Sequence, residues 1–301
     1  MKIGIIGLGD IAKKAYLPVY ASVKDVEFHL YTRNQDTLTE VAETYRFQNV
    51  HQSIDSMVQS GIVAAFVHSS TESHPEIIRE LLNNNIHVYV DKPISYNYET
   101  SKGLVALAEE KNRILMVGFN RRFAPVNSEL KKAIPEPNMM IVQKNRNGLP
   151  NDVRTFVMDD FIHVIDTMRF LYPYQIEEIT VKGRKKDNLL YHVVVQFQSE
   201  NCTAIGIMNR DSGTREEKVE VMSSAEKRVI YNVAEAEIHK NSQVIKLASN
   251  DWEPTLHKRG FEQLVAEFIA SVKGDREPSI SSSDALQTHE ICEFIIQKLG
   301  E

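Results

Sequence analysis

The chain has 301 residues, of which 42% are hydrophobic and 25% are charged, and its formal net charge at pH 7 is -6. This length allows two domains with separate hydrophobic cores, and the acidic balance gives no basic bias toward nucleic acid or an anionic membrane surface. Every apolar run is shorter than the roughly 18 residues that a membrane-spanning helix needs. We therefore expect a globular protein that binds neither nucleic acid nor membrane.

The cysteines and the N-terminus bear on the compartment. Cys202 and Cys292 are far apart and in no metal-binding or redox spacing, so the sequence predicts no metal site and fits a reducing cytoplasm. The first segment, MKIGIIGLGDIAKK, starts like a signal peptide, but its glycines and Asp10 interrupt the apolar stretch. We expect a cytoplasmic protein.

Short apolar segments alternate with amphipathic segments over the first 118 residues. The apolar segments, which we expect to be strands, cover residues 2–7, 26–32, 63–69, 86–92 and 113–119. Helical spacing occurs between them at residues 11–23, 35–47, 73–85 and 98–111. Strands that are apolar on both faces and separated by helices are typical of a parallel sheet covered on both sides. With right-handed crossovers, this pattern predicts a doubly wound α/β fold.

The pattern changes after the segment NRRFAP. A polar stretch over residues 135–154 precedes one predicted helix over residues 159–172. Strands with no crossover helix between them follow at residues 176–184, 189–199, 202–210, 217–224 and 227–240, and helices at 260–274 and 282–300 end the chain. This order predicts an α+β domain with an antiparallel meander. We place the boundary near Gly118 to Pro125, which gives domains of residues 1–120 and 121–301.

The first predicted strand ends in GLGDIA, where Gly7, Gly9 and Ala12 occupy the positions of a dinucleotide-binding turn. Gly7 permits the tight turn, Gly9 lets the backbone approach a pyrophosphate, and a small third residue lets the helix pack closely. The helix begins near Asp10 and Ile11, where backbone N–H groups and the positive end of the dipole favour phosphate. Because the turn opens a β-α-β unit, the sequence predicts a bound dinucleotide.

The end of the second predicted strand bears on which dinucleotide binds. An NAD site usually has an acid there for the ribose hydroxyls, whereas this chain has Thr32, Arg33 and Asn34. An arginine with small polar neighbours suits a 2′-phosphate, so we expect NADP, with NAD as the alternative. Arg33 could also be an ordinary exposed residue at a strand end.

Two predicted elements carry candidate catalytic residues. The fifth strand ends in Asp91 and Lys92, at the carboxyl end where parallel sheets bind ligands. Neighbours in an extended chain point to opposite sides, so Asp91 need not neutralise Lys92. On the helix further along, Asp159 and Asp160 both lie within reach of His163, and a carboxylate orients an imidazole for proton transfer. Either aspartate could instead cap the helix, and the histidine could be structural.

A basic segment precedes that helix, with Lys144, Asn145, Arg146 and Arg154. These residues could bind an acidic substrate such as a sugar acid or a phosphate, or they could form a solvated basic loop. We retain Lys144 and Arg146 as candidate substrate-binding residues.

Four motifs occur in a fixed order along the chain: GLGDIA, DKP at residues 91–93, VGFNRRFAP, and D-x-x-x-H-x-x-D on the next helix. Together they resemble the Gfo/Idh/MocA oxidoreductases, and the segments AFVHSSTESH and DDFIHVIDT are most similar to the MviM-type branch. The resemblance covers essentially the whole chain. It implies an N-terminal Rossmann domain and a C-terminal domain whose open-faced antiparallel sheet binds substrate and forms a homo-oligomer, either a dimer or a tetramer.

The resemblance also implies an activity, the transfer of hydride between NAD(P) and a sugar, polyol or related small molecule. Lys92 matches the lysine that binds the reacting oxygen. Asp159 and His163 match the family's Asp-x-Gly-x-His, which selects Asp159 as the carboxylate that orients the general acid/base His163. Phe161 stands where the family usually has glycine and would narrow the site. Arg122 matches an arginine at the wall of the substrate cleft.

Further cofactor contacts follow from the same resemblance. The loop after the fourth strand reads SSTESH where the family commonly has Thr-Pro-Asn-x-x-His. The implied contacts are Ser69, Ser70, Thr71, His74, Asp91 and Lys92.

Two other functions share this architecture. One is an NADP(H)-binding sensor or regulator without chemistry, although the presence of both Lys92 and His163 favours an enzyme. The other is a biliverdin-reductase-like enzyme, which an apolar, aromatic-lined cleft would indicate.

Overall fold

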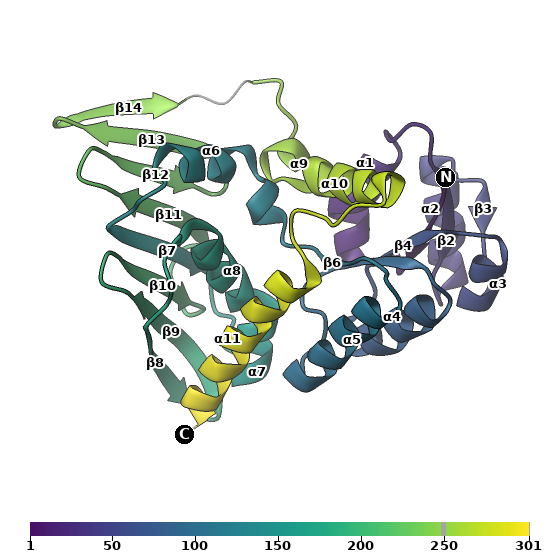
Figure 1. Ribbon diagram of the computed structural model, residues 1–301, viewed down its shortest axis with the longest axis horizontal. Helices are drawn as coiled ribbons and strands as arrows, with labels where there is room; N and C mark the ends of the chain where they lie inside the picture. The colour runs from purple at the N-terminus through teal and green to yellow at the C-terminus, as the bar shows by residue number, and fades with distance from the viewer. Residues whose placement is uncertain (248–250, 301) are drawn as a thin grey trace. The chain divides into compact units, whose positions relative to one another are not determined.

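The computed structural model describes residues 1–247 and 251–300, and the chain divides into two compact units (Figure 1). The first unit combines Met1–Gly118 with Phe261–Gln287, and the second combines Phe119–Gly260 with residues 288–300. The sequence predicted two consecutive domains that meet near residue 120. The structure differs from that division, because residues 261–287 return to the first unit.

Aromatic packing by helix α10 (Phe261–Gly274) explains this return. The ring centroid of Phe268 lies 4.9 Å from that of Phe66 and 5.7 Å from that of Tyr89, and both partners are strand residues of the first unit. Buried aromatic rings contribute strongly to a core. These contacts join residues that are far apart in the chain, so no local pattern in the sequence reveals them.

The first unit contains a six-stranded sheet in the order β3-β2-β1-β4-β5-β6. Its strands are β1 Lys2–Ile6, β2 Glu27–Tyr31, β3 Asn49–Val50, β4 Ala64–Val67, β5 His87–Val90 and β6 Leu115–Val117. Every neighbouring pair is parallel. The predicted doubly wound parallel fold is confirmed, and the strand order changes direction between β1 and β4.

Helices cover both faces of this sheet. They are η1 Ala12–Tyr16, α1 Leu17–Tyr20, α2 Gln35–Tyr45, α3 Ile54–Gln59, η2 Thr71–Ser73, α4 His74–Asn83 and α5 Tyr98–Glu110. Figure 1 shows α1 and α10 on one side of the sheet and α4 and α5 on the other. Polar side chains set several helix starts: Asn34 and Asn97 each accept a hydrogen bond from a backbone N–H in the first turn of α2 and α5.

The second unit contains an eight-stranded sheet in the order β14-β13-β12-β11-β7-β10-β9-β8. Its strands are β7 Met139–Asn145, β8 Glu178–Lys186, β9 Leu189–Gln198, β10 Thr203–Asn209, β11 Glu216–Met222, β12 Lys227–Tyr231, β13 Glu235–Lys240 and β14 Gln243–Leu247. The pairing is antiparallel except between β7 and β10, which run parallel. The sheet is therefore mixed rather than the simple meander that the sequence predicted.

Two strand predictions in this unit need correction. The stretch of residues 135–154, described from the sequence only as polar, holds the central strand β7, because Met140 and Val142 alternate into the core. Residues 227–240, expected to be one strand, form β12 and β13. Asn232 and Val233 have φ values of 52° and 59° between them, and this left-handed backbone turns the chain.

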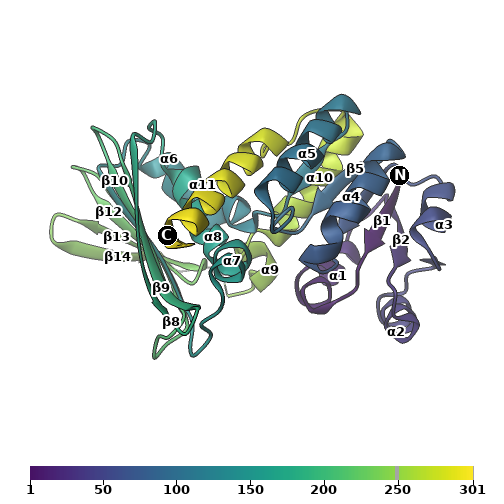
Figure 2. The ribbon, with the colours of Figure 1, turned by 90° about the horizontal axis from the view of Figure 1, so that it is seen from below.

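The helices of the second unit are η3 Asn120–Phe123, α6 Pro125–Ala133, α7 Val153–Thr155, η4 Phe156–Phe161, α8 Ile162–Leu171 and α9 Thr255–Lys258, and α11 Ser282–Gly300 ends the chain. Figure 2 shows α6 and α8 on the same side of the sheet. A Cβ on Gly206 in β10 would lie 2.4 Å from Met168 Sδ, so this glycine lets α8 approach the sheet closely. No helix in the described part of the chain is long and apolar enough to cross a membrane.

Candidate active site

A cavity of about 450 Å³ lies in the first unit at the carboxyl ends of β1, β2 and β4. Part of the predicted cofactor set lines it: Gly7, Gly9, Thr32, Arg33, Ser69 and Ser70. The strand order changes direction at this point of the sheet, and open parallel sheets bind ligands at such switch points. The cavity has the position that a dinucleotide site requires.

The two glycines of the first turn have separate structural reasons. Gly7 has a φ of 89°, and a Cβ there would lie 2.5 Å from the backbone nitrogen of Ser69, so a larger residue would meet both backbone strain and a clash. A Cβ on Gly9 would meet nothing within 4 Å. The backbone at Gly9 therefore faces open space, into which a phosphate can approach.

The remaining predicted cofactor residues are not among those that line the cavity: Asp10, Ile11, Asn34, Thr71, His74, Asp91 and Lys92. Asp10 lies on the surface with Oδ1 2.7 Å from Lys14 Nζ. The Asn34 side chain accepts a hydrogen bond from Thr37 N at 2.9 Å and so caps α2. Short polar residues at the end of a strand often cap the following helix, which is what Asn34 does here.

The cavity also includes residues that the sequence did not single out. They are Ile6, Leu8, Tyr31, Ile54, His68, Ser73, Glu76, Ile77 and Glu80. Glu76 and Glu80 are four residues apart on α4, a spacing that places them on one face. Burial, and then the charges of Asp55 and Glu76, raises the pKa of Glu80.

Asp91 lies at the centre of a buried hydrogen-bond network. Tyr16 donates to its Oδ1 at 2.6 Å, and His68 Nδ1 lies 2.8 Å from its Oδ2. The network extends from His68 Nε2 to Tyr20 at 2.7 Å and from Tyr16 to Tyr89 at 2.6 Å. Burial would raise the pKa of Asp91, but the charge and hydrogen bond of His68 and the hydrogen bond of Tyr16 hold it below its ordinary value. Both carboxylate oxygens are therefore engaged inside the first unit.

His74 connects two loops at the same edge of the sheet. Its Nδ1 lies 2.9 Å from the carbonyl oxygen of Pro93, and its Nε2 lies 3.0 Å from that of Ser69. Burial lowers the pKa of His74, and a neutral ring can donate only one of these two hydrogen bonds. Lys92 is partly exposed and precedes Pro93 through a cis peptide bond. The ring of His74 thus fixes the backbone next to Lys92.

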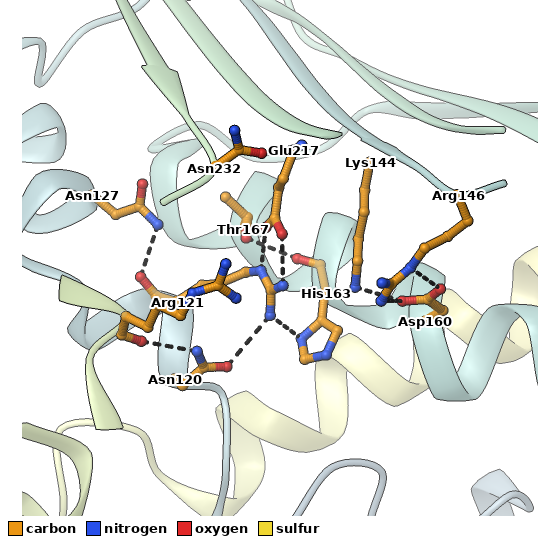
Figure 3. A network of polar contacts seen from close by, with 11 residues as sticks. Asn120, Arg121, Asn127, Lys144, Arg146, Asp160, His163, Thr167, Glu217 and Asn232 are labelled. Carbon is orange, nitrogen blue, oxygen red and sulfur yellow. Dashed lines mark hydrogen bonds and ion pairs between the residues drawn. The ribbon is translucent and has the colours of Figure 1, made fainter. Parts of the chain in front are cut away.

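His163 lies in α8 of the second unit and contacts Arg121 (Figure 3). Arg121 Nη1 is 2.7 Å from His163 Nδ1, and the same guanidinium forms two hydrogen bonds to Glu217. A guanidinium only donates, so Nδ1 of His163 is the acceptor and the neutral ring carries its proton on Nε2.

The predicted pair Asp159 and His163 lies in two consecutive helical segments. Asp159 is part of the π-helix Phe156–Phe161, and His163 is part of α8, which follows it directly. Asp159 is partly exposed, whereas Asp160 and Phe161 are buried. Asp160, the alternative carboxylate for orienting His163, is therefore buried inside the second unit.

Asp160 is held by a group of cations. Lys144 Nζ is 2.5 Å from Asp160 Oδ1, and Arg146 makes two contacts of 3.1 Å with the same carboxylate (Figure 3). Arg210 Nε is 3.9 Å from Asp160 Oδ2. Burial, and then the charge of Arg121, lowers the pKa of Lys144 to about 7 against the opposing effect of Asp160. Burial would raise the pKa of Asp160, but Lys144 and Arg146 hold it well below its ordinary range. The predicted substrate residues Lys144 and Arg146 thus meet on one buried carboxylate.

Comparisons with known proteins agree with this architecture. Residues 1–119 match the family model described as an oxidoreductase family with an NAD-binding Rossmann fold, and residues 125–241 match a YceM-like C-terminal domain. An oxidoreductase designated YceM from Salmonella typhimurium is 31% identical over 98% of this chain and 97% of its own. The chain belongs to the Gfo/Idh/MocA oxidoreductase family.

Other relatives are consistent with this membership. The crystal structure of a dehydrogenase, MviM, from Clostridium difficile is 34% identical, with a TM-score of 0.95 and coverage of 99% of both chains. A myo-inositol 2-dehydrogenase from Thermotoga maritima is 24% identical over 94% of this chain and 92% of its own. The chain is thus an oxidoreductase, with dehydrogenases among its relatives.

Two further arginines of this oxidoreductase form ion pairs, one buried and one partly exposed. Arg122 donates to both oxygens of Asp166 at 2.7–3.0 Å, and Asp166 also accepts from Thr288 at 3.1 Å. Arg154 forms a two-point contact with Glu293 at 2.7 and 2.9 Å. Among the described residues, no group of three or more His, Cys, Asp or Glu side chains could hold a metal ion.

Proposed function

We propose that this oxidoreductase transfers hydride between the nicotinamide of NADP and a hydroxyl or carbonyl carbon of a sugar, polyol or related small molecule. The cavity at the switch point of the six-stranded sheet carries this proposal. Gly7 and Gly9 shape a turn with room for a pyrophosphate, and Ser69 and Ser70 supply polar groups on the opposite loop. When bound, the nicotinamide accepts or delivers the hydride, and the protein orients the substrate and manages one proton.

Arg33 supports NADP as the preferred cofactor, with NAD as the alternative. Arg33 and Thr32 line the cavity beyond β2, where a guanidinium can pair with a 2′-phosphate. Glu76 and Glu80 line the same cavity and oppose the binding of a phosphate there. The choice of cofactor therefore rests on Arg33 outweighing these two acids.

We assign the binding of the reacting oxygen to Lys92. Its ammonium would stabilise negative charge that develops on that oxygen during hydride transfer. The neighbouring carboxylate of Asp91 has both oxygens committed to Tyr16 and His68. His74 fixes the Pro93 carbonyl just beyond it, which limits how far Lys92 can shift from its productive position.

Proton transfer is assigned to His163, oriented by Asp159. In the contact with Arg121, Nδ1 of His163 accepts a hydrogen bond and Nε2 carries the proton, which suits hydrogen bonding to a substrate oxygen. To act as a general acid, the ring needs protons on both Nε2 and Nδ1. To act as a general base at Nε2, it needs its single proton on Nδ1. That proton requires a carboxylate in place of Arg121, which is the role we give to Asp159.

A sugar or polyol substrate is supported by the myo-inositol 2-dehydrogenase among the relatives. We also propose that the protein works in the cytoplasm, where its free thiols Cys202 and Cys292 stay reduced. A homo-oligomer, either a dimer or a tetramer, would use the sheet face that carries the exposed Val194.

Replacement of Lys92 tests the proposed function. Lys92→Met should retain NADPH binding, measured by fluorescence titration, and should lower turnover with a sugar, inositol or keto-acid substrate about 1,000-fold, the order expected for loss of charge stabilisation at the reacting oxygen. Lys102→Met, at an exposed position of α5, is the matched control and should retain full turnover. Equal turnover of the Lys92 variant and the wild type would contradict the role of Lys92. Absence of NADPH turnover across the whole panel would favour the sensor instead.

A further inference from the structure

The second unit gathers cations around two carboxylates, and Figure 3 shows three of these cations, Arg121, Lys144 and Arg146. The cations are Arg121, Lys144, Arg146 and Arg210, and the carboxylates among them are Glu217 and Asp160. The topology explains the arrangement, because β7 and β10 are parallel and their carboxyl ends lie side by side. Arg146 follows β7 and donates its backbone N–H to Asn209 O, which places it beside Arg210 at the end of β10.

Arg121 and Glu217 satisfy each other, so the balance of charge depends on Asp160. This one carboxylate faces Lys144, Arg146 and Arg210. A carboxylate has about four sites for hydrogen-bond donors. Lys144 and Arg146 take the close positions at 2.5 and 3.1 Å, and Arg210 remains at 3.9 Å.

Arg210 therefore keeps donors without acceptors. Its Nε and Nη1 atoms are buried, and neither has a hydrogen-bond partner among the described residues. The side chain is only 12% exposed, and its guanidinium carbon lies 5.3 Å from the centre of the Phe156 ring, which supports one face. Buried guanidinium donors without acceptors are unfavourable, so the arrangement calls for an acceptor that the described residues do not supply.

The surrounding charges point to an anion as that acceptor. Asp159 acts on Arg210 as a more distant carboxylate, and Arg259 acts on Glu217 as a more distant cation, so these two offset each other. Burial and neighbouring cations lower the pKa of Lys144 to about 7, despite the carboxylates of Asp160 and Glu217. Burial is the larger cause of this lowered pKa, and the positive charges of Arg121 and Arg146 add to it.

We propose that Arg210, together with Arg146, binds an acidic group of the substrate, a carboxylate or a phosphate. A planar guanidinium edge matches either group with two parallel hydrogen bonds. The sugar or polyol derivative on which this oxidoreductase acts then carries an acid group away from the carbon that reacts. The assignment of this group as part of a substrate rests on the proposed function, whereas the binding of the anion does not.

Matched pairs of acidic and neutral sugars test the proposal. Glucuronate and glucose 6-phosphate, each compared with glucose, distinguish a carboxylate from a phosphate. The wild type should show a kcat/KM at least 30-fold higher for one of the acids than for glucose. Arg210→Met should lower that preference to less than 3-fold, Arg210→Lys should restore part of it, and Arg184→Met, at an exposed position of β8, should leave it unchanged. A wild type that prefers glucose, or an Arg210 variant that loses acid and neutral substrates equally, would overturn the proposal.

A binding measurement decides the question if none of these sugars is turned over. Sodium sulfate at 50 mM should raise the Tm of the wild type more than sodium chloride of equal ionic strength. This difference should shrink in Arg210→Met to the small general effect of sulfate and return in part in Arg210→Lys. A sulfate effect of the same size in Arg210→Met would overturn the anion site. A sulfate effect that depends on Arg210, combined with no oxidation of NADPH by any substrate, would support the anion site and count against the proposed function instead.

Discussion

Each unit contains a buried aspartate at the centre of a polar network, and the two networks differ in how they are completed. Asp91 in the first unit is bound by a tyrosine and a histidine, and the network continues to Tyr20 and Tyr89. Asp160 in the second unit faces three cations, one of which keeps unpaired donors. A network of mostly neutral partners can be complete without a ligand. A network with more buried cations than carboxylates is fully paired only when an anion binds. The first network therefore supports the fold, whereas the second can bind a ligand.

Removal of the Asp160 carboxylate from the second network should give the largest loss in the free energy of unfolding. Asp160→Asn leaves Lys144, Arg146 and Arg210 without a counter-charge, and removal of one partner of a buried ion pair typically costs about 3–5 kcal/mol. We expect a loss of this order in the free energy of unfolding at pH 6, where Lys144 keeps its proton. Urea denaturation, followed by hydrogen exchange in peptides of the second unit, measures it. A loss below about 1 kcal/mol would show that the cations are not held by Asp160.

The equivalent change in the first unit provides the control. Asp91→Asn keeps the shape of the side chain and one acceptor for Tyr16, and its partners are not permanently charged. We expect a smaller loss, about 1–3 kcal/mol, as for one unsatisfied buried polar group. If Asp91→Asn proves as costly as Asp160→Asn, the distinction between the two networks is wrong.

Lys144 should make the second network sensitive to pH. Its pKa is about 7 in the folded protein against an ordinary 10.5, so between these values the unfolded state binds more protons and stability rises with pH. The rise should be about 2–5 kcal/mol between pH 7 and 10, and Lys144→Met should abolish it. The groups that face Lys144 are Arg121, Arg146, Asp160 and Glu217. A wild-type unfolding free energy that stays constant over this range would contradict the prediction.

An exposed cation in the first unit should give the smallest effect. Arg33 is exposed, unlike Arg210, so water screens its interaction with a phosphate. We expect Arg33→Ala to lower the preference for NADP over NAD about 10-fold, measured from the two Michaelis constants. Arg79→Ala, at an exposed position of α4, serves as the control. An unchanged preference in the Arg33 variant would leave cofactor choice to other residues of the cavity.

The parts of the fold that follow from local patterns could be predicted from the sequence. The parallel strands of the first unit are continuous apolar runs, and Gly7 lies where a backbone clash and a positive φ both demand glycine. Strand β7 was missed because only Met140 and Val142 mark its inner face, and its last residues are polar. The return of α10 to the first unit depends on Phe268 meeting Phe66 and Tyr89, which no local pattern encodes.

The candidate site shows the same division. Helical spacing could suggest which carboxylates lie near His163, whereas the contact of His163 with Arg121 joins residues 42 positions apart and leaves no local pattern. The basic residues Lys144 and Arg146 were visible in the sequence as candidates for an acidic substrate. Arg210 was not, because its lack of an acceptor emerges only when two parallel strands place three cations around one aspartate.

The position of β7 also has a consequence for how the chain folds. β7 comes first in the sequence of the second sheet yet lies at its centre, where Asn145 is opposite Asn209 and Glu216, 64 and 71 residues later. The other neighbours in the sheet are consecutive strands that can pair as hairpins, which form quickly because their loops are short. From this topology we expect β7 to join the two groups of hairpins into one sheet late in folding. The basic cluster around Lys144 would then form at that stage, and β7, still unpaired, would be open to association with other chains until then.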